Sequence, residues 1–427
     1  MNRNLWLVLS GMFCLVATQT IAFVLVPLAA ARLGLPGSSI GVLVAVMAGL
    51  GLAAEVPVAV MSDRLGRRAP MLLGTVLGMV AGGILSVASD YLGLLAGAVA
   101  FGLSMSLAVG PALAYVTEAC RPREAARVQG YNGAVQGLSA LAGAIAIALA
   151  VEHLGPQRSA LLIAGLMAFA LLAFVSLEET VSRSKVRSSK ELAGGYATAI
   201  RLLIARPQLQ LAALVLLIFY SVVFVVGNSF LPLYIVHDLG ESAVLAGTLI
   251  ATRNAAMTLS SLLFGHAVSH FGLVPTMLVA NSVAVAGVAG LSVLTDSRLL
   301  VVLLALQGLG MGLTAATANT LVASATRAEA RALGFAATSV VSRGGSLLSP
   351  LLFGIILETS GGRAVFVAAG AIGVGYLATM VMRARLVGDD ERRRWIPGGT
   401  AEDEAVAVNA RTHRVVGWSM RDDERLD

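Results

Sequence analysis

Three ionisable side chains stand inside long apolar runs of the sequence: Glu55, Arg253 and Arg343. A charge at the centre of a membrane-spanning helix costs about 2.5–3.5 kcal/mol, so each should face protein or water and have a use. A carboxylate can carry a proton, and a guanidinium offers an anion a planar fork of N–H donors. These residues are therefore candidates for binding ions or solutes within an apolar protein.

Arg253 stands near the middle of its run, beside Asn254, and its own half of the chain offers no obvious acidic partner. We expect Arg253 to point into a central cavity and, with Arg343, to favour anionic solutes. The alternative is that Arg253 bonds backbone carbonyls at a helix break. Uncharged polar residues in such runs are more often helix–helix hydrogen bonds than solute contacts. The remaining cavity candidates are Gln19, Gln136, Asn228, Asn254, Gln307 and Asn319.

A second group of charges lies in the short segment "MSDRLGRRAP" (61–70). It holds Asp63, Arg64, Arg67 and Arg68 around Gly66. Glycine permits the backbone conformations that a rapid change of direction requires. A carboxylate such as that of Asp63 is favoured opposite the N-terminal end of another helix, where the helix dipole is positive.

The composition indicates a membrane protein. Of 427 residues, 57% are hydrophobic and 13% are charged, and the mean hydropathy is +0.85; soluble domains carry roughly 25% charged residues. The net charge of +6 does not indicate nucleic-acid binding, because the basic residues stand between apolar runs. No catalytic constellation, nucleotide loop or three-ligand metal set is visible, so we expect no enzyme activity, cofactor or metal.

Apolar runs of about twenty residues suit helices that cross ~30 Å of hydrocarbon. We predict an all-α integral membrane protein with twelve transmembrane spans, at 5–31, 39–60, 70–89, 92–118, 128–151, 159–177, 209–236, 243–264, 275–294, 298–325, 332–357 and 364–384. Two six-helix bundles, 1–178 and 209–385, are joined by a basic cytoplasmic linker, 179–208. The mixed-charge tail, 386–427, lacks an apolar period and is predicted to be disordered.

Lys and Arg set the expected orientation. With the N-terminus inside, the inside segments before the tail hold 15 of these residues and the outside loops hold four. An even number of spans returns the C-terminus to the same side. We therefore expect a multi-pass protein of the plasma or inner membrane with both termini in the cytoplasm.

The sequence also repeats itself. A shift of 206 residues superposes glycines and loop residues: Gly34 on Gly240, Gly41 on Gly247, Gly66 on Gly272 and Gly155 on Gly361. Each half has an even number of spans, so the halves share one orientation. They form a parallel repeat related by an axis along the membrane normal.

Two six-span halves, a basic linker and "AVMSDRLGRR" between spans two and three resemble the major facilitator superfamily over about residues 5–385. The superfamily's loop motif reads G-x-L-a-D-r-x-G-r-r. Ala59 and Met61 replace its first Gly and its Leu, whereas Asp63, Arg64, Gly66, Arg67 and Arg68 match. The resemblance implies this twelve-helix fold and two bundles that rock around a central cavity.

The resemblance also implies that Asp63 faces span eleven of the other half, and topology makes Glu118 the nearest acid for Arg67. In the second copy these three positions become Ser269, Leu273 and Ser324. If the three charges form one unit, they should be lost together, because any one of them retained alone would be an unpaired charge near the membrane. We expect the loop charges and Glu118 to form a cytoplasmic latch; the alternative is that the arginines only set topology.

Spans two and eleven lie against each other in the superfamily, which brings Glu55 and Arg343 to similar depth. Glu55 lies ~12 Å from the end of its run and Arg343 ~16 Å from the start of its own, at 1.5 Å per residue. We expect the two to pair in one state and part in another, or to form a static salt bridge. Span four carries Ala98 where proton-driven exporters carry Arg, and span five lacks their Gly-Pro pair. Glu55 is the only deep acid able to carry a proton.

We predict a secondary transporter of a small organic solute, working by alternating access. Export of amphipathic or drug-like compounds is the first expectation, because the expected cavity residues are mostly apolar. The resemblance to the superfamily, and not the motifs of spans four and five, suggests a proton as the coupling ion. Uptake or exchange of an organic anion through Arg253 and Arg343 is the alternative. A non-transporting membrane sensor or assembly partner is the alternative of another class. We expect a monomer in the lipid bilayer whose partners are solute and H⁺.

Overall fold

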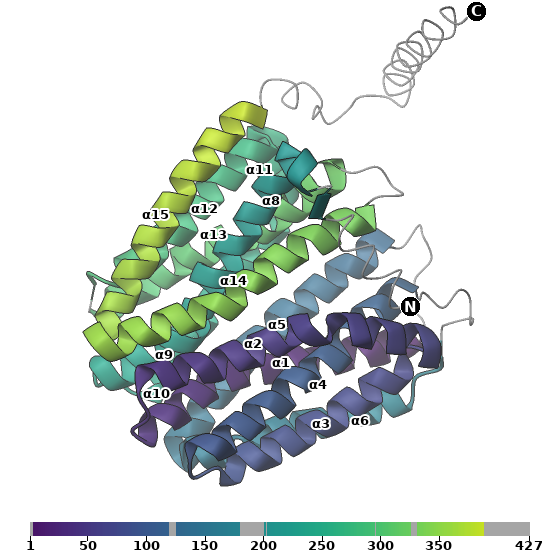
Figure 1. Cartoon of the computed structure of the whole chain (residues 1–427), viewed down its shortest axis with the longest axis vertical. Coiled ribbons are helices and arrows are strands. Elements are labelled where there is room, and N and C mark those ends of the chain that lie inside the picture. Colours follow the sequence, from purple (N-terminus) through teal and green to yellow (C-terminus); the bar gives the residue numbers. More distant parts are fainter. Residues whose placement is uncertain are drawn as a thin grey trace, which may run out of the picture.

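The computed structural model describes residues 3–118, 125–179, 200–201, 203–294, 296–325 and 331–387, which are helical with short connections and contain no strand (Figure 1). The first half contains α1 (Arg3–Arg32), α2 (Gly37–Leu65), α3 (Arg68–Val87), α4 (Tyr91–Glu118), α5 (Ala125–Ser159) and α6 (Leu161–Val175). The second half contains α8 (Pro207–Ile218), η2 (Phe219–Phe224), η3 (Val226–Phe230), α9 (Leu231–Leu233), η4 (Tyr234–Asp238), α10 (Ala243–Leu262), α11 (Phe264–Phe271), α12 (Leu273–Gly290), α13 (Ser297–Ala325), α14 (Arg331–Ser360) and α15 (Gly362–Val387).

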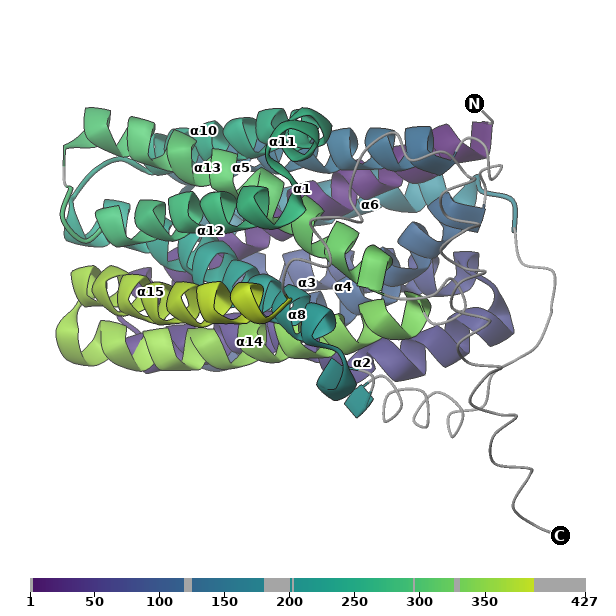
Figure 2. The same ribbon diagram turned by 90° about the horizontal axis from the view of Figure 1, so that it is seen from above.

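Within these ranges the chain passes twelve times between two ends of one helical bundle (Figures 1 and 2). The segments from α8 to η4 form one passage, Pro207–Asp238, and α10 continues into α11. We call the end where α1 begins the terminal end and the end where α2 begins the distal end. The predicted all-α fold with two six-helix repeats is confirmed. The linker residues 180–199 and 202 and the tail from 388 lie outside the described residues.

The repeat is visible in the turns. In the described part of the chain, six glycines have positive φ, and they form three pairs separated by 206 residues: Gly34 (70°) with Gly240 (67°), Gly66 (88°) with Gly272 (81°), and Gly155 (75°) with Gly361 (82°). Positive φ is a conformation that glycine adopts without steric cost. The matched glycines in the sequence therefore mark turns of equal geometry in the two halves.

The two halves meet at the distal end through helix crossings that obey the same repeat. On the α2–α14 crossing, a side chain at Gly41 would collide with the carbonyl oxygen of Pro350. On the α10–α5 crossing, a Cβ at Gly247 would lie 2.8 Å from the carbonyl oxygen of Ala144. Each residue of the first contact lies 206 positions from its counterpart in the second. Small residues allow membrane helices to approach closely, so both crossings are tight because of these glycines.

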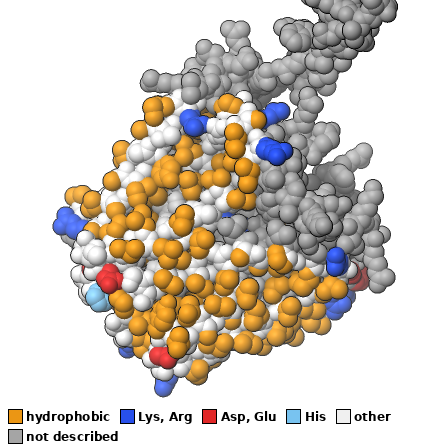
Figure 3. All heavy atoms as spheres, viewed as in Figure 1, with side chains coloured by type: hydrophobic (Ala, Val, Ile, Leu, Met, Phe, Trp, Pro, Cys, Tyr) orange, Lys and Arg blue, Asp and Glu red, His pale blue; other side chains and the backbone are white. Residues whose placement is uncertain are grey.

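The surface of the bundle is suited to lipid. Figure 3 shows hydrophobic side chains spread over the visible face, with Lys, Arg, Asp and Glu gathered near its edges. Large apolar side chains such as Phe169 (68% exposed) and Leu348 (64% exposed) point outward. By length and composition, nine of the described helical segments could cross a membrane. Water would penalise this much exposed apolar surface, whereas hydrocarbon does not.

The predicted spans agree with the helices except where local backbone geometry intervenes. The fifth span is longer than predicted, because α5 extends to Ser159 through a break at Gly155 (φ 75°). Span seven is not a regular α-helix: η2, η3 and η4 are π-helical. Apolar periodicity does not signal such wide turns, which in other proteins often mark functional sites.

Candidate functional site

The charged loop between α2 and α3 is organised by Glu179, which follows α6. The Glu179 carboxylate accepts hydrogen bonds from the backbone N–H groups of Arg67 (3.0 Å) and Arg68 (3.2 Å). These groups stand at the start of α3, which has no side-chain cap of its own. A carboxylate at this place satisfies free N–H groups and matches the helix dipole. Any side chain at Gly66 would collide with Glu179.

The neighbouring Glu178 holds two more helices at the terminal end. Its carboxylate accepts a hydrogen bond from Asn4 Nδ2 (3.2 Å) and lies 3.9 Å from the Arg3 guanidinium. Its backbone carbonyl accepts a bond from the Tyr115 hydroxyl on α4 (2.7 Å). Glu178 and Glu179 together therefore tie α1, α3 and α4 to the end of α6.

The loop arginines point back onto the same bundle. Arg67 Nη1 donates to Ser62 Oγ (2.9 Å), and Arg68 Nη2 donates to the carbonyl oxygen of Val175. The side chains of Asp63 and Glu118 lie outside the described part of the structure, so their predicted contacts stay predictions. Arg64 is exposed. Sequence reasoning passed over Glu179; the only signal for it was an acidic pair directly after the sixth apolar run.

Arg253 lies in the interior of the second half. Its side chain is 0% exposed, and Nη2 donates to Oδ1 of Asn228 on η3 at 2.7 Å. Among the described residues, Nε and Nη1 have no hydrogen-bond partner and no acid lies within ion-pair distance. The sequence predicted that Arg253 points into a central cavity; in this structure its side chain is buried, and its role as a solute contact stays a prediction. Its partner is a side-chain amide and not the backbone carbonyl of the alternative prediction.

Asn228 connects Arg253 to the boundary between the halves. Asn228 Nδ2 donates to the carbonyl oxygen of Phe224 (2.8 Å), which leaves Oδ1 free to accept from Arg253. The Phe224 ring packs edge-on against Phe23 of α1, with ring centroids 6.0 Å apart. The guanidinium is thus connected, through Asn228 and Phe224, to a contact between the two halves.

The second deep arginine lies on α14 against α2. Arg343 is half-buried, and its Nη1 would lie 3.3 Å from a Cβ at Gly51. Gly51 and Glu55 are four residues apart on α2, and residues at this spacing share one helix face. The Glu55 side chain lies outside the described part. The backbone therefore brings the two predicted partners to one level of the α2–α14 crossing.

The distal end is closed by a hydrogen bond between the halves. The Glu358 carboxylate, near the end of α14, accepts from the backbone N–H of Ser38 at 3.0 Å. Gly37 and Gly354 pack backbone to backbone beside it, so that a Cβ at Gly37 would lie 2.6 Å from the Gly354 carbonyl oxygen. In Figure 1, α2 and α14 draw together toward the distal end and spread apart toward the terminal end.

Comparison with protein families decides the relationship. The family model described as Major Facilitator Superfamily matches residues 8–251 and again 226–420. The chain belongs to the major facilitator superfamily. Comparison with functionally curated proteins gives no match.

Solved structures of superfamily transporters share the fold. A nucleoside transporter, NupG, superposes with a TM-score of 0.75 at 15% identity, over 90% of this chain and 100% of that one. A D-xylose–proton symporter gives 0.72 at 14% identity, over 88% and 96%. A bacterial homolog of the human lysosomal transporter Spinster, inward-facing and unoccupied, gives 0.71 at 15% identity, over 90% and 98%. At these identities the likeness concerns the fold.

For this member of the superfamily, the uncharged polar candidates lie in different environments. Asn254 and Gln307 are buried, and both polar side-chain atoms of Gln307 lack a hydrogen-bond partner in the described part of the chain. Gln19 and Gln136 are half-buried, and Asn319 is exposed. The structure brings Arg253 and Asn228 together, and sequence reasoning had placed them in separate spans without predicting their contact.

Proposed function

We propose that the protein is a secondary transporter that moves a small organic solute by alternating access. The observation that carries this proposal is the pair of repeat-related crossings, Gly41 on Pro350 and Gly247 on Ala144. Two halves joined by matched contacts at one end can rock about the middle of the bundle. In the proposed cycle these distal crossings open as the terminal end closes.

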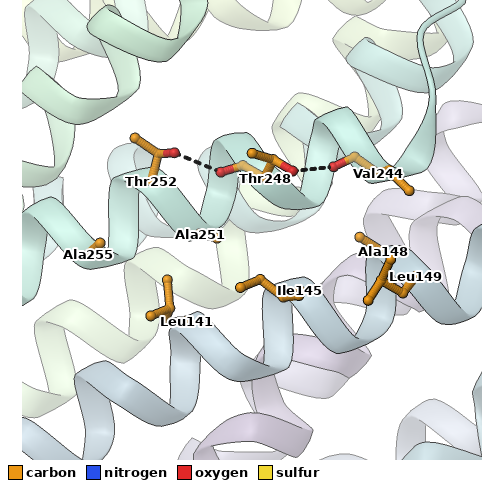
Figure 4. Close-up of a pocket in the computed structure, with 9 residues that line it drawn as sticks. All are labelled: Leu141, Ile145, Ala148, Leu149, Val244, Thr248, Ala251, Thr252 and Ala255. Atoms are coloured by element: carbon orange, nitrogen blue, oxygen red, sulfur yellow. Dashed lines mark hydrogen bonds between the residues drawn. The ribbon is translucent and has the colours of Figure 1, made fainter.

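We propose export of amphipathic compounds as the direction and solute class. An apolar groove between the halves supports this choice (Figure 4). It is lined from α5 by Leu141, Ile145, Ala148 and Leu149, and from α10 by Val244, Thr248, Ala251, Thr252 and Ala255. The hydroxyls of Thr248 and Thr252 donate to carbonyls of their own helix, so the groove presents mainly carbon. An apolar molecule in the bilayer would partition onto such a surface.

A proton is the proposed coupling ion, with Glu55 as its carrier. Arg343 reaches the α2 backbone one turn from Glu55. A carboxylate that pairs with Arg343 in one state and loses it in another would bind protons differently in the two states. Such differential binding is what couples an ion to a conformational change.

The charged loop is the proposed latch for the opposite state. When the terminal end closes, Asp63 would face the N-terminal end of α14. Asp63→Asn is then expected to raise the labelling rate of a cysteine placed at Ser342 of α14 from the terminal side. Unchanged labelling would count against the latch.

Flux in proteoliposomes with an imposed pH gradient tests the proposed function. Amphipathic dyes of positive, zero and negative charge are loaded, and Glu55→Gln is compared with the unsubstituted protein. We expect gradient-driven movement of at least one dye, and no response to the gradient in Glu55→Gln. If every dye crosses proteoliposomes at the same rate as liposomes without protein, the proposal is ruled out.

Uptake or exchange of an organic anion is the second candidate, favoured by the unpartnered donors of Arg253. The result that distinguishes this candidate is anion movement that does not depend on pH and that is abolished in Arg253→Ala. That result would overturn proton-driven export. The proposed setting in either case is the cell membrane, with both termini in the cytoplasm and the protein as a monomer.

A further inference from the structure

Arg253 holds hydrogen-bonding capacity that the described structure does not use. A guanidinium carries five N–H donors, and among the described residues the one acceptor bonded to it is Oδ1 of Asn228. Nε and Nη1 are buried without a partner. Unmet donors on a buried charge are costly. Arginine does not release its proton under ordinary conditions, so an acceptor from outside the described chain is the remaining way to satisfy it.

The surroundings of Arg253 are arranged to keep the guanidinium in this position. Gly227 provides the space, because a side chain there would collide with Nη1. The Asn228 amide is oriented by its bond to the Phe224 carbonyl, so its oxygen faces the arginine. Gly308 of α13 packs against the backbone carbonyl of Arg253. Neighbours that fix a charged group before a ligand arrives reduce the cost of binding.

We propose that Arg253, oriented by Asn228, binds the carboxylate of the transported solute. Two observations select this chemistry. A guanidinium matches a planar carboxylate with paired N–H donors. No second described cation is hydrogen-bonded to Asn228. The single positive charge of Arg253 therefore balances a solute with one negative charge and not two. Val226, Leu249 and Ile250, within four residues of Gly227 or Arg253 in the sequence, are fully buried and apolar, which favours a solute whose remaining part is mainly apolar. The substrate class is small amphipathic monocarboxylates.

The route to this site follows from its link to the boundary between the halves. Asn228 contacts the Phe224 carbonyl, and the Phe224 ring rests on Phe23 of α1. Parting of α1 from η2 separates those rings and uncovers the turn that carries Asn228. Asn228 lies in the π-helical η3, which follows the π-helical η2, and π-helical turns are frequent at functional sites. The carboxylate therefore reaches Arg253 as the halves rock, which rests on the proposed function.

Binding is tested apart from transport, with full-length protein in lipid nanodiscs. Benzoate, octanoate and cinnamate are each titrated beside their primary amides, and inorganic phosphate and chloride are titrated separately. The readouts are the melting temperature and isothermal titration calorimetry. We expect at least one carboxylate to bind at least tenfold more tightly than its amide.

Three variants assign that preference to the site. Arg253→Gln and Gly227→Ala are expected to reduce the carboxylate-over-amide ratio to about one, a loss that corresponds to the removed charge-assisted hydrogen bonds. Gly375→Ala is the matched control, because a Cβ there meets nothing within 4 Å, and it should keep the ratio. Melting temperatures without ligand report whether each variant folds.

Several outcomes overturn the proposal. The first is that no carboxylate binds more tightly than its amide. The second is a preference for the carboxylate that survives Arg253→Gln in folded protein. The third is that phosphate or chloride alone binds in a manner that depends on Arg253. The proposed function fails separately: carboxylate binding without any flux retains the site and rejects transport, and flux of neutral and anionic solutes alike retains transport and rejects the site.

Discussion

The Glu358 carboxylate accepts a hydrogen bond from the backbone amide of Ser38 at 3.0 Å, across 320 residues of chain and between the two halves. The start of α2 needs this partner, because its N-cap residue is Pro36 and no side chain caps it. The corresponding helix of the second half, α10, is capped locally by Ser242, whose hydroxyl accepts from the Leu245 amide at 3.1 Å. The α2–α14 crossing therefore depends on the other half for its helix cap, and the α10–α5 crossing does not.

Replacing Glu358 should favour opening at the distal end. In a protein without Cys14 and Cys120, a cysteine at Leu357 is reacted with a membrane-impermeant maleimide. Glu358→Ala should raise the labelling rate about two- to tenfold, as expected for loss of one helix cap. Glu358→Gln keeps an acceptor oxygen, so its labelling rate should lie between those of the unsubstituted protein and Glu358→Ala. A rate unchanged in both variants would show that the bond does not hold the crossing closed.

Adding one methyl group at Gly41 should force the same crossing apart. The new Cβ of Gly41→Ala would collide with the Pro350 carbonyl, and overpacking of this kind costs about 1–3 kcal/mol. We expect a lower melting temperature and slower flux. Gly83→Ala on α3 is the control, since nothing lies within 4 Å of its Cβ. Equal behaviour of the two variants would contradict a close-packed distal contact.

Arg253→Gln should stabilise the protein while removing carboxylate binding. It deletes a buried charge with two unpartnered nitrogens, and such unmet groups cost about 1–3 kcal/mol each. Thermal unfolding in nanodiscs without ligand should show a higher melting temperature, whereas Arg253→Lys should not gain stability. A large loss of stability in Arg253→Gln with retained binding would instead indicate that Arg253 only supports packing.

Replacing Glu179 should lower the stability of the protein, because Glu179 caps α3 beside the charged loop. Glu179→Ala leaves the first N–H groups of α3 without their acceptor, and losing a helix cap costs about 0.5–2 kcal/mol. Gly66→Ala should cost more, because it adds strain at φ 88° to a collision with Glu179. Thermal unfolding of both variants checks the order. Gly272→Ala is the repeat counterpart at φ 81° and has no such collision. Its loss of stability therefore measures the backbone strain alone.

The sequence predicted the features that depend on pattern. Glycines paired at a spacing of 206 residues identified turns of equal conformation, because positive φ restricts the residue type. The same spacing paired Gly41 with Gly247, and the structure places these two glycines at close approaches in the two crossings. The apolar runs located the passages, because membrane thickness sets helix length.

The features that depend on three-dimensional contact could not be predicted. Glu179 stands in a polar segment with many charges, and nothing in its spacing marks it as the cap of α3. The Arg253–Asn228 bond joins spans seven and eight at a rotation that depends on π-helical turns, which leave no periodic signal. Residue type predicted that Arg253 faces protein or water, but it could not distinguish burial among protein groups, which the structure shows, from exposure to a cavity.

The central claim is that the two halves rock, so that the distal end opens as the terminal end closes. Electron-spin distance measurements in nanodiscs test it with one label pair at the distal ends of α2 and α14, Ser39 and Thr359, and one toward their terminal ends, Leu65 and Ser339. Relative to the unsubstituted protein, Gly41→Ala should lengthen the distal distance and shorten the terminal one. Distal lengthening with an unchanged or longer terminal distance would contradict alternating access.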